Sequence, residues 1–178
     1  MTWLTQANPC DTAVRILGKA QHRYRVLAGK IAHMGYRLFG ERLTARETLM
    51  RLSQRIRLGG IYVYGDDICV GPRCVNYKEF FEAIEEYYDA YRDRLRALRD
   101  IEFYCDGNKP SVCREEVEKY LERIKELWDI PINPKKVMKD LRILAITKDP
   151  KFPEALEIVG SFMRARRRLI RCAEQAIS

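Results

Sequence analysis

Apolar and basic residues recur at helical spacing over the first third of the chain. From Asp11 to about Phe39, the basic side chains other than Arg25 share an arc of about 100° on a helical wheel, and apolar side chains fill the opposite side. The basic side consists of Arg15, Lys19, His22, Arg23, Lys30, His33 and Arg37. The apolar side consists of Leu17, Tyr24, Leu27, Ala28, Ile31, Ala32 and Leu38. This pattern predicts an amphipathic helix, and we expect its apolar side to pack on neighbouring subunits.

Three glycines within this segment, Gly18, Gly29 and Gly40, follow one another at intervals of eleven residues. Eleven residues make close to three helical turns, so these glycines return to nearly the same face. Because glycine lacks a Cβ atom, it lets a helix approach a bulky partner closely or bend around it. The repeat therefore favours a helix that lies against a large partner, with a chance resemblance as the alternative.

A second basic helix is predicted to follow. Thr44 and Glu47 have the spacing of a capping box, and Gly59-Gly60 is typical of a helix end. The apolar seam of this helix consists of Leu49, Leu52 and Ile56. Its cations are Arg42, Arg46 and Arg57 on one side and Arg51 and Arg55 on another flank. Two consecutive basic helices are suited to clasping a nucleic-acid duplex or following its backbone.

The segment from Ile61 to Val70 has β character. β-Branched and aromatic residues flank a Gly65-Asp66 turn, which predicts a short hairpin that Gly71-Pro72 ends. The sequence Tyr64-Gly65-Asp66-Asp67 also resembles the metal-binding hairpin of RNA-dependent polymerases, where adjacent carboxylates help to hold two divalent ions. That site needs a second carboxylate strand upstream, whereas the preceding acids lie on helical patterns. Gly-Asp-Asp favours a tight turn for steric reasons alone, so we expect no catalytic role here.

Helical spacing resumes at Asn76, which forms a second capping pattern with Glu79. A stripe of apolar and aromatic residues then continues over about seven turns. Its members are Tyr77, Phe80, Phe81, Ile84, Tyr87, Tyr88, Tyr91, Leu95, Leu98 and Ile101. The stripe predicts the core face of an amphipathic helix, and stacking of its rings on nucleic-acid bases is the alternative.

Three further helices are predicted: one roughly over residues 111–128, one over 133–147, and a final helix that contains Ala155 to Arg171. The predicted fold class is therefore all-α with one short β-hairpin. We expect a basic helical arm at residues 1–60, a β-hairpin connector at 61–75 and a four-helix bundle at 76–178. The last helix carries a second, smaller basic cluster of Arg164, Arg166, Arg167, Arg168 and Arg171.

The net charge of +8 is unevenly distributed. Residues 1–60 contain eleven Lys and Arg against three acids, whereas residues 61–178 contain twenty-two of each sign. This asymmetry favours a polyanionic partner, because cations at phosphates displace condensed counterions; a solvated face of a stable protein is the alternative. The expected nucleic-acid-binding residues are Arg15, Lys19, His22, Arg23, Lys30, His33, Arg37, Arg42, Arg46, Arg51, Arg55 and Arg57.

Six cysteines are many for a chain of 178 residues. Four of them form two close pairs, Cys69 with Cys74 and Cys105 with Cys113, each bracketing turn residues. Local disulfides in these pairs suit an extracellular particle or a hyperthermophile. A zinc site is an alternative, although it lacks tight C-x-x-C spacing and a nearby histidine. Reduced, buried thiols are the other alternative.

Sequence motifs of common enzymes are missing. The chain has neither a nucleotide-binding G-x-x-x-x-G-K-[ST] loop nor a G-x-S-x-G nucleophile elbow. We therefore expect no enzyme, no cofactor and no metal site. No apolar run approaches the roughly 20 residues of a membrane span, and we interpret the N-terminus as lacking a secretory signal.

The chain has basic helices over residues 11–58, followed by a near-neutral bundle over 76–177. This organisation resembles the major capsid proteins of filamentous and rod-shaped archaeal viruses. The resemblance implies that the helical arm wraps linear double-stranded DNA, held in the A form, while the bundle forms the wall of a helical virion. It also implies pairing as a homodimer or as a heterodimer with a related capsid subunit. A composition rich in Arg, Glu and Tyr suits a hyperthermophilic host.

Independently of this resemblance, the charged residues of the first third of the chain support packaging of nucleic acid without recognition of its sequence. Eight net positive charges offset roughly eight phosphates, or about four base pairs for each arm. Such contacts position a protein without reading bases. Two alternatives stay open. One is a non-capsid helical nucleic-acid-binding protein in the cytoplasm, such as a regulator or a small subunit of an RNA-guided complex. The other is an enzyme that uses Asp66 and Asp67 with magnesium.

Overall fold

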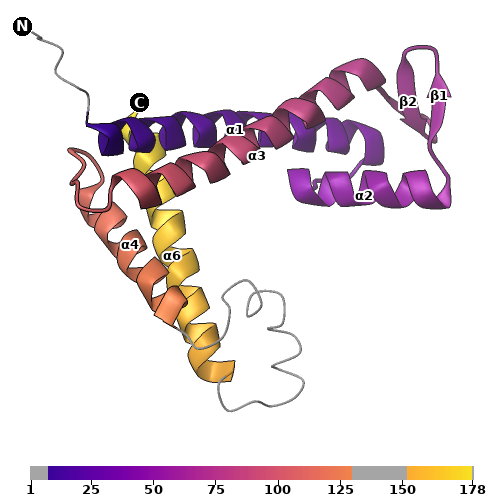
Figure 1. Ribbon diagram of the computed structural model, residues 1–178. Helices are drawn as coiled ribbons and strands as arrows, with labels where there is room; N and C mark the ends of the chain where they lie inside the picture. Colours follow the sequence, from indigo (N-terminus) through magenta and orange to yellow (C-terminus); the bar gives the residue numbers. More distant parts are fainter. Residues whose placement is uncertain (1–7, 130–151, 178) are drawn as a thin grey trace, which may run out of the picture. The chain divides into compact units, whose positions relative to one another are not determined.

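The computed structural model describes residues 8–129 and 152–177 (Figure 1). The helices are α1 (Pro9–Phe39), α2 (Ala45–Leu58), α3 (Tyr77–Tyr104), α4 (Arg114–Asp129) and α6 (Phe152–Ala176), and the strands are β1 (Tyr62–Tyr64), β2 (Asp67–Val70) and β3 (Arg73–Asn76). This arrangement confirms the mostly helical fold with a short β element. The helix predicted over residues 133–147 lies outside the described residues. None of the described helices combines the length with the apolar character that crossing a membrane requires.

The chain divides into two compact units. Unit 1 comprises Met1–Lys19 and Arg96–Ser178, and unit 2 comprises Ala20–Leu95. Helices α1 and α3 each contribute one part to unit 1 and the other part to unit 2. The units therefore do not coincide with the consecutive arm, connector and bundle expected from the sequence.

Side-chain caps fix the starts of three helices. The Thr44 hydroxyl accepts a hydrogen bond from the Glu47 N–H at 3.1 Å, and the Glu47 carboxylate accepts one from the Thr44 N–H at 3.2 Å. Asn76 likewise accepts from the Glu79 N–H at 3.0 Å, so both predicted caps are confirmed. Helix α1 begins two residues before the predicted start at residue 11, because Asn8 accepts a hydrogen bond from the Cys10 N–H at 3.0 Å.

The small sheet is antiparallel with strand order β1-β2-β3. Val63 pairs with Ile68 across the predicted hairpin, and Cys69 pairs with Cys74 across a second hairpin. Strand β3 was not predicted, because Gly71-Pro72 forms a further turn, with Gly71 at φ 57°, instead of ending the sheet.

The core of unit 2 lies between α1, α2, α3 and the sheet. One cluster contains Leu27, Ile31, Ala45, Ala83, Tyr87 and Ala90, and a second contains Met34, Leu38, Leu52, Ile68, Val75 and Phe80. The expectation that the apolar side of α1 packs on neighbouring subunits is therefore wrong for unit 2, because α2 and α3 of the same chain bury it. The aromatic stripe of α3 divides between core rings, such as Phe80, and exposed rings, such as Phe81.

The core of unit 1 is built by α4, α6 and the adjoining ends of α1 and α3. Its buried members include Val14, Leu17, Leu98, Ile101, Val117, Tyr120, Leu169 and Ala173. Helices α4 and α6 lie side by side and antiparallel (Figure 1). Gly18 permits a close approach of α1 to α6, because a Cβ at this position would lie 2.2 Å from the carbonyl oxygen of Ala173.

All six cysteines form disulfides, of which the Cys69–Cys74 pair matches the sequence expectation. The expected Cys105–Cys113 pair is wrong: Cys105 bonds to Cys10, and Cys113 bonds to Cys172. Helix packing in unit 1 explains the difference, since it brings the Cα atoms of these pairs to 4.8 Å and 5.9 Å.

Candidate nucleic-acid interface

One face of α1 in unit 2 is a row of exposed cations and histidines. We call His22, Arg23, Lys30, His33 and Arg37 the α1 strip. The residues on the other side of the same turns, including Leu27, Ile31 and Leu38, are buried. Burial therefore separates the two sides of this helix as the helical wheel predicts. Arg15 and Lys19, which were expected in the same row, are also exposed but belong to unit 1.

A second row lies on α2. We call Arg46 and Arg57, which are both exposed, the α2 strip; Arg42 precedes the helix and is exposed as well. Arg55 is exposed on another flank of α2. Arg51 differs from these residues, because its guanidinium forms a 3.0 Å ion pair with Glu41 and lies 5.9 Å from the centre of the Phe39 ring. The Arg51 side chain is therefore engaged by Glu41 and Phe39 of the same chain.

The α1 and α2 strips face away from each other. The two helices meet where Gly35 of α1 contacts Thr48 of α2. Lys30 and Arg37 lie about 140° and 160° around α1 from Gly35. Arg46 and Arg57 lie about 160° and 180° around α2 from Thr48. The two strips are thus basic rows on opposite sides of unit 2. That these helices clasp a duplex or follow its backbone stays a prediction.

Most of these cations carry charge that the chain does not neutralise. Arg23 forms a long ion pair of 3.6 Å with Asp93, and both side chains stay about half exposed, so the attraction is screened by solvent. Among the described residues, no ion pair engages the cations Lys30, Arg37, Arg42, Arg46, Arg55 and Arg57. These six side chains are the charge available to a polyanion.

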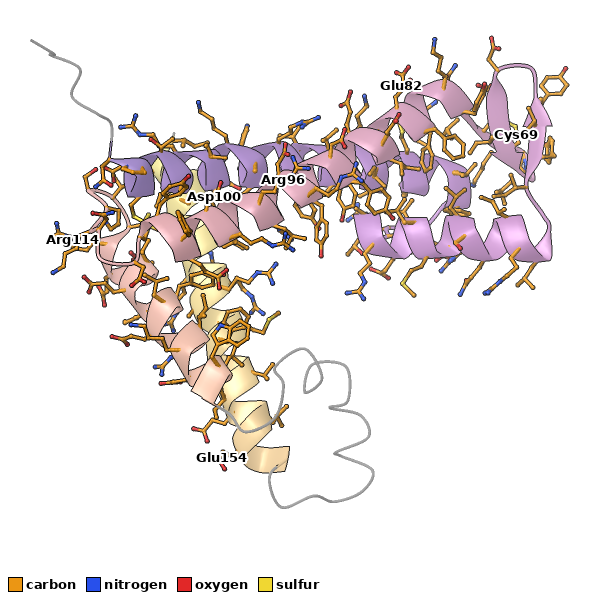
Figure 2. The ribbon with its side chains drawn as sticks, in the orientation of Figure 1. Cys69, Glu82, Arg96, Asp100, Arg114 and Glu154 are labelled. Carbon is orange, nitrogen blue, oxygen red and sulfur yellow. A yellow bond between two sulfur atoms is a disulfide. The ribbon has the colours of Figure 1, made fainter. Side chains whose placement is uncertain are left out.

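Helix α3 gives unit 2 the opposite charge on its remaining surface. Between residues 77 and 95 it carries six acids and three cations. Glu82, which is exposed, is one of these acids (Figure 2). Repulsion between these carboxylates and phosphates restricts the candidate interface to α1 and α2.

A partly buried aromatic cluster holds α1 against α3 inside unit 2. The hydroxyl groups of Tyr24 and Tyr87 are 2.8 Å apart, and burial together with this hydrogen bond raises the pKa of Tyr87. The Arg94 guanidinium lies 4.2 Å from the centre of the Tyr24 ring and donates to Gln21 at 2.9 Å. Helical periodicity places these tyrosines on apolar faces but does not predict the cluster, which fixes the orientation of the α1 strip.

The Gly-Asp-Asp turn has few of the features of a metal site. Asp66 is exposed in the turn between β1 and β2, and Asp67 begins β2. In residues 8–129 and 152–177, the one group of three potential metal ligands is Cys113, Glu116 and Cys172, and its two cysteines are bonded to each other. The described residues therefore place no third ligand beside Asp66 and Asp67.

Comparison with known proteins finds no match to this chain among family models, curated proteins or solved structures.

Proposed function

We propose that this protein is a structural capsid protein that packages linear double-stranded DNA in a helical virion without reading its sequence. The observation that supports the proposal is the pair of basic strips on opposite sides of unit 2. A protein with unpaired cations on two sides can contact two stretches of phosphate backbone at once. That property suits packaging, in which neighbouring stretches of one long polymer must be held close together despite their repulsion.

Phosphate contacts supply the affinity in this proposal. The six cations named above, on and beside α1 and α2, offset roughly six phosphates, or about three base pairs at one charge per 1.7 Å of duplex. This number counts individual cations of unit 2, whereas the eight expected from the sequence is the net charge of residues 1–60. Arginine forks fit phosphate oxygens in two parallel hydrogen bonds, which hold the protein in register without base contacts.

The proposal also requires that many copies of the protein assemble on the DNA. Contacts with a few base pairs for each chain are too weak to condense DNA singly, so many copies act together, paired as homodimers or with a related subunit. A filament with a regular repeat is the expected product.

The test is negative-stain microscopy of the purified protein mixed with linear duplex DNA of random sequence. Three charge-matched variants are compared with the unmodified protein: Lys30→Gln/Arg37→Gln in the α1 strip, Arg46→Gln/Arg57→Gln in the α2 strip, and Lys78→Gln/Arg92→Gln on α3 as the control. We expect regular filaments from the unmodified protein and the control. Each strip variant should still retain DNA but form no condensed filaments, since only one side of unit 2 stays basic.

Two outcomes oppose the proposal. Complexes of fixed stoichiometry with no filaments at any protein concentration would favour a non-capsid nucleic-acid-binding protein instead. If a variant that combines all four strip substitutions forms normal filaments, the strips have no role in packaging.

A further inference from the structure

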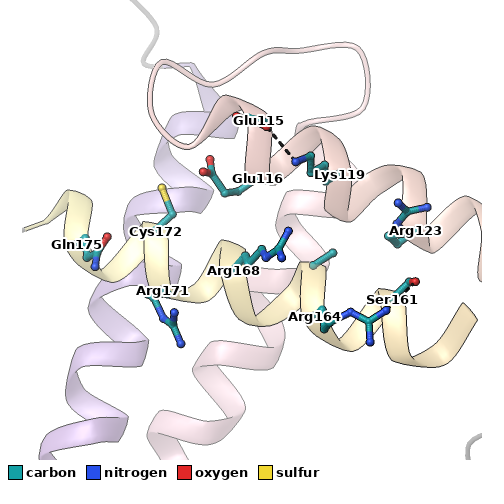
Figure 3. A pocket seen from close by; sticks show the side chains of 11 residues that line it. Glu115, Glu116, Lys119, Arg123, Ser161, Arg164, Arg168, Arg171, Cys172 and Gln175 are labelled. Carbon is teal, nitrogen blue, oxygen red and sulfur yellow. Dashed lines mark hydrogen bonds and ion pairs between the residues drawn. The ribbon is translucent and has the colours of Figure 1, made fainter. Parts of the chain in front are cut away.

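A groove between α4 and α6 in unit 1 is lined mainly by charged side chains (Figure 3). Its volume is about 480 Å³. The α4 wall contributes Glu115, Glu116, Lys119 and Arg123, and the α6 wall contributes Ser161, Arg164, Arg168 and Arg171. From the sequence, the arginines of α6 were expected only to form a second basic cluster.

The arginines of α6 form a single row. Arg164, Arg168 and Arg171 are spaced by four and three residues, so they lie on one side of the helix (Figure 3). The opposite side of the same turns buries Leu169 and Ala173 in the core of unit 1. Helix packing therefore presents all three arginines to the groove together.

The acids at the groove do not neutralise this row. Glu115 pairs with Lys119 at 2.9 Å, and this contact lowers the pKa of the Glu115 carboxyl. Arg123 pairs with Glu126 at 2.6 Å. Arg164 donates a 3.2 Å hydrogen bond to the uncharged Ser161 hydroxyl, and no ion pair among the described residues engages Arg168 or Arg171. Glu116 is left as the acid facing three arginines.

Like charges at this spacing repel one another and destabilise a helix. A bound anion removes that repulsion. The row extends over about 10 Å of helix, at a rise of roughly 1.5 Å per residue. A single phosphate is too short to reach all three guanidinium groups, whereas a chain of linked phosphates spans the row.

We propose that the α4–α6 groove binds a short chain of linked phosphates. Guanidinium groups recognise phosphate oxygens through paired, charge-assisted hydrogen bonds, and Lys119 and Arg123 on the facing wall add positive charge. Two sources have this chemistry: the sugar-phosphate backbone of a nucleic acid and an inorganic polyphosphate. The proposal uses none of the residues of the α1 and α2 strips, so it does not depend on their function.

The test is isothermal titration calorimetry of the full chain with three probes: inorganic tripolyphosphate, hexathymidylate and orthophosphate. The groove variant is Arg168→Gln/Arg171→Gln. The matched control is Arg114→Gln/Arg167→Gln, which removes two exposed charges from α4 and α6 outside the groove lining. Thermal denaturation verifies that both variants fold.

We expect the unmodified protein and the control to bind tripolyphosphate with similar affinity and orthophosphate at least tenfold more weakly. The groove variant should lose at least tenfold in tripolyphosphate affinity. A parallel loss of hexathymidylate binding identifies a nucleic-acid backbone as the source, and binding of tripolyphosphate alone identifies a polyphosphate.

The proposal is overturned if the groove variant binds both linked-phosphate probes like the unmodified protein, or if the unmodified protein binds neither. The four-substitution strip variant separates this result from the packaging proposal. It should keep its tripolyphosphate site, because that site belongs to unit 1, even though its DNA filaments are lost.

Discussion

Gly35 of α1 lies so close to Thr48 of α2 that a Cβ atom at position 35 would be 2.2 Å from the Thr48 Oγ1 atom. Thr48 is fully buried, and its hydroxyl has no hydrogen-bond partner among the described residues. This contact sets how α1 and α2 are rotated relative to each other. It therefore directs Lys30 and Arg37 to one side of unit 2 and Arg46 and Arg57 to the other.

We expect Gly35→Ala to destabilise the protein. Overpacking of this kind costs typically about 1–3 kcal/mol, which outweighs the gain of up to about 1 kcal/mol that alanine brings to a helix interior. Chemical denaturation measures the change in the free energy of unfolding. Gly29→Ala in the same helix is the control, because no atom lies within 4 Å of its Cβ position, and it should stabilise the protein.

A substitution of Thr48 tests whether its contact with position 35 causes this destabilisation. Thr48→Ala removes the two atoms that a Cβ at position 35 would approach most closely. Gly35→Ala should therefore cost less in the Thr48→Ala background than in the unmodified protein, by about 1 kcal/mol or more for residues in direct contact. Strict additivity of the two substitutions would show that the close approach does not determine the packing of these helices.

The three disulfides should differ in their contribution to stability. By the chain-entropy relation, loops of 95 and 59 residues correspond to about 4–5 kcal/mol each, whereas the five-residue loop of Cys69–Cys74 corresponds to about 2 kcal/mol. We expect Cys10→Ala/Cys105→Ala to lower the denaturation midpoint more than Cys69→Ala/Cys74→Ala. Peptide mapping under non-reducing conditions verifies the connectivity, and a fragment joining Cys105 to Cys113 would contradict it.

Glu102 should make stability depend on pH. Burial raises the pKa of its carboxyl above the ordinary value of 4.5, and Arg99 offsets only part of this shift. The folded chain then holds the proton more tightly than the unfolded chain, so this group lowers stability as the pH rises through 4.5 and through the raised pKa.

Glu102→Gln should therefore raise the melting temperature at pH 7 and have a smaller effect at a pH well below 4.5. Glu118→Gln, at an exposed position of α4, is the control and should change little at either pH. An equal effect of Glu102→Gln at both pH values would show that burial of charge at Glu102 is not the cause.

Local signals in the sequence predicted the local structure well. The caps at Thr44 and Asn76 depend on residues three positions apart, and the two sides of α1 follow from helical periodicity. A helical wheel orients side chains within one helix but not between helices. Helical periodicity therefore predicts both basic rows, but it does not predict that the Gly35–Thr48 contact turns them away from each other.

Pairings between residues on different helices were not predicted correctly either, because sequence patterns do not show how helices pack on one another. Cys105 and Cys113 are close in sequence, but the packing of α1 on α3 and of α4 on α6 decides which thiols meet. The strand β3 was missed because Gly-Pro is typical of strand ends and equally suits a turn between strands. The groove between α4 and α6 likewise depends on two helices that lie far apart in the chain.

The salt dependence of DNA binding is the most direct measure of phosphate contact by the two strips. The affinity for a linear duplex of random sequence is measured across a series of salt concentrations, for the unmodified protein and for the Lys30→Gln/Arg37→Gln/Arg46→Gln/Arg57→Gln variant. We expect the slope of log affinity against log salt to become shallower by about 3.6, or 0.9 for each cation removed, and the Lys78→Gln/Arg92→Gln control to keep the original slope. An unchanged slope in the four-substitution variant would contradict phosphate binding by the strips, and with it the packaging function.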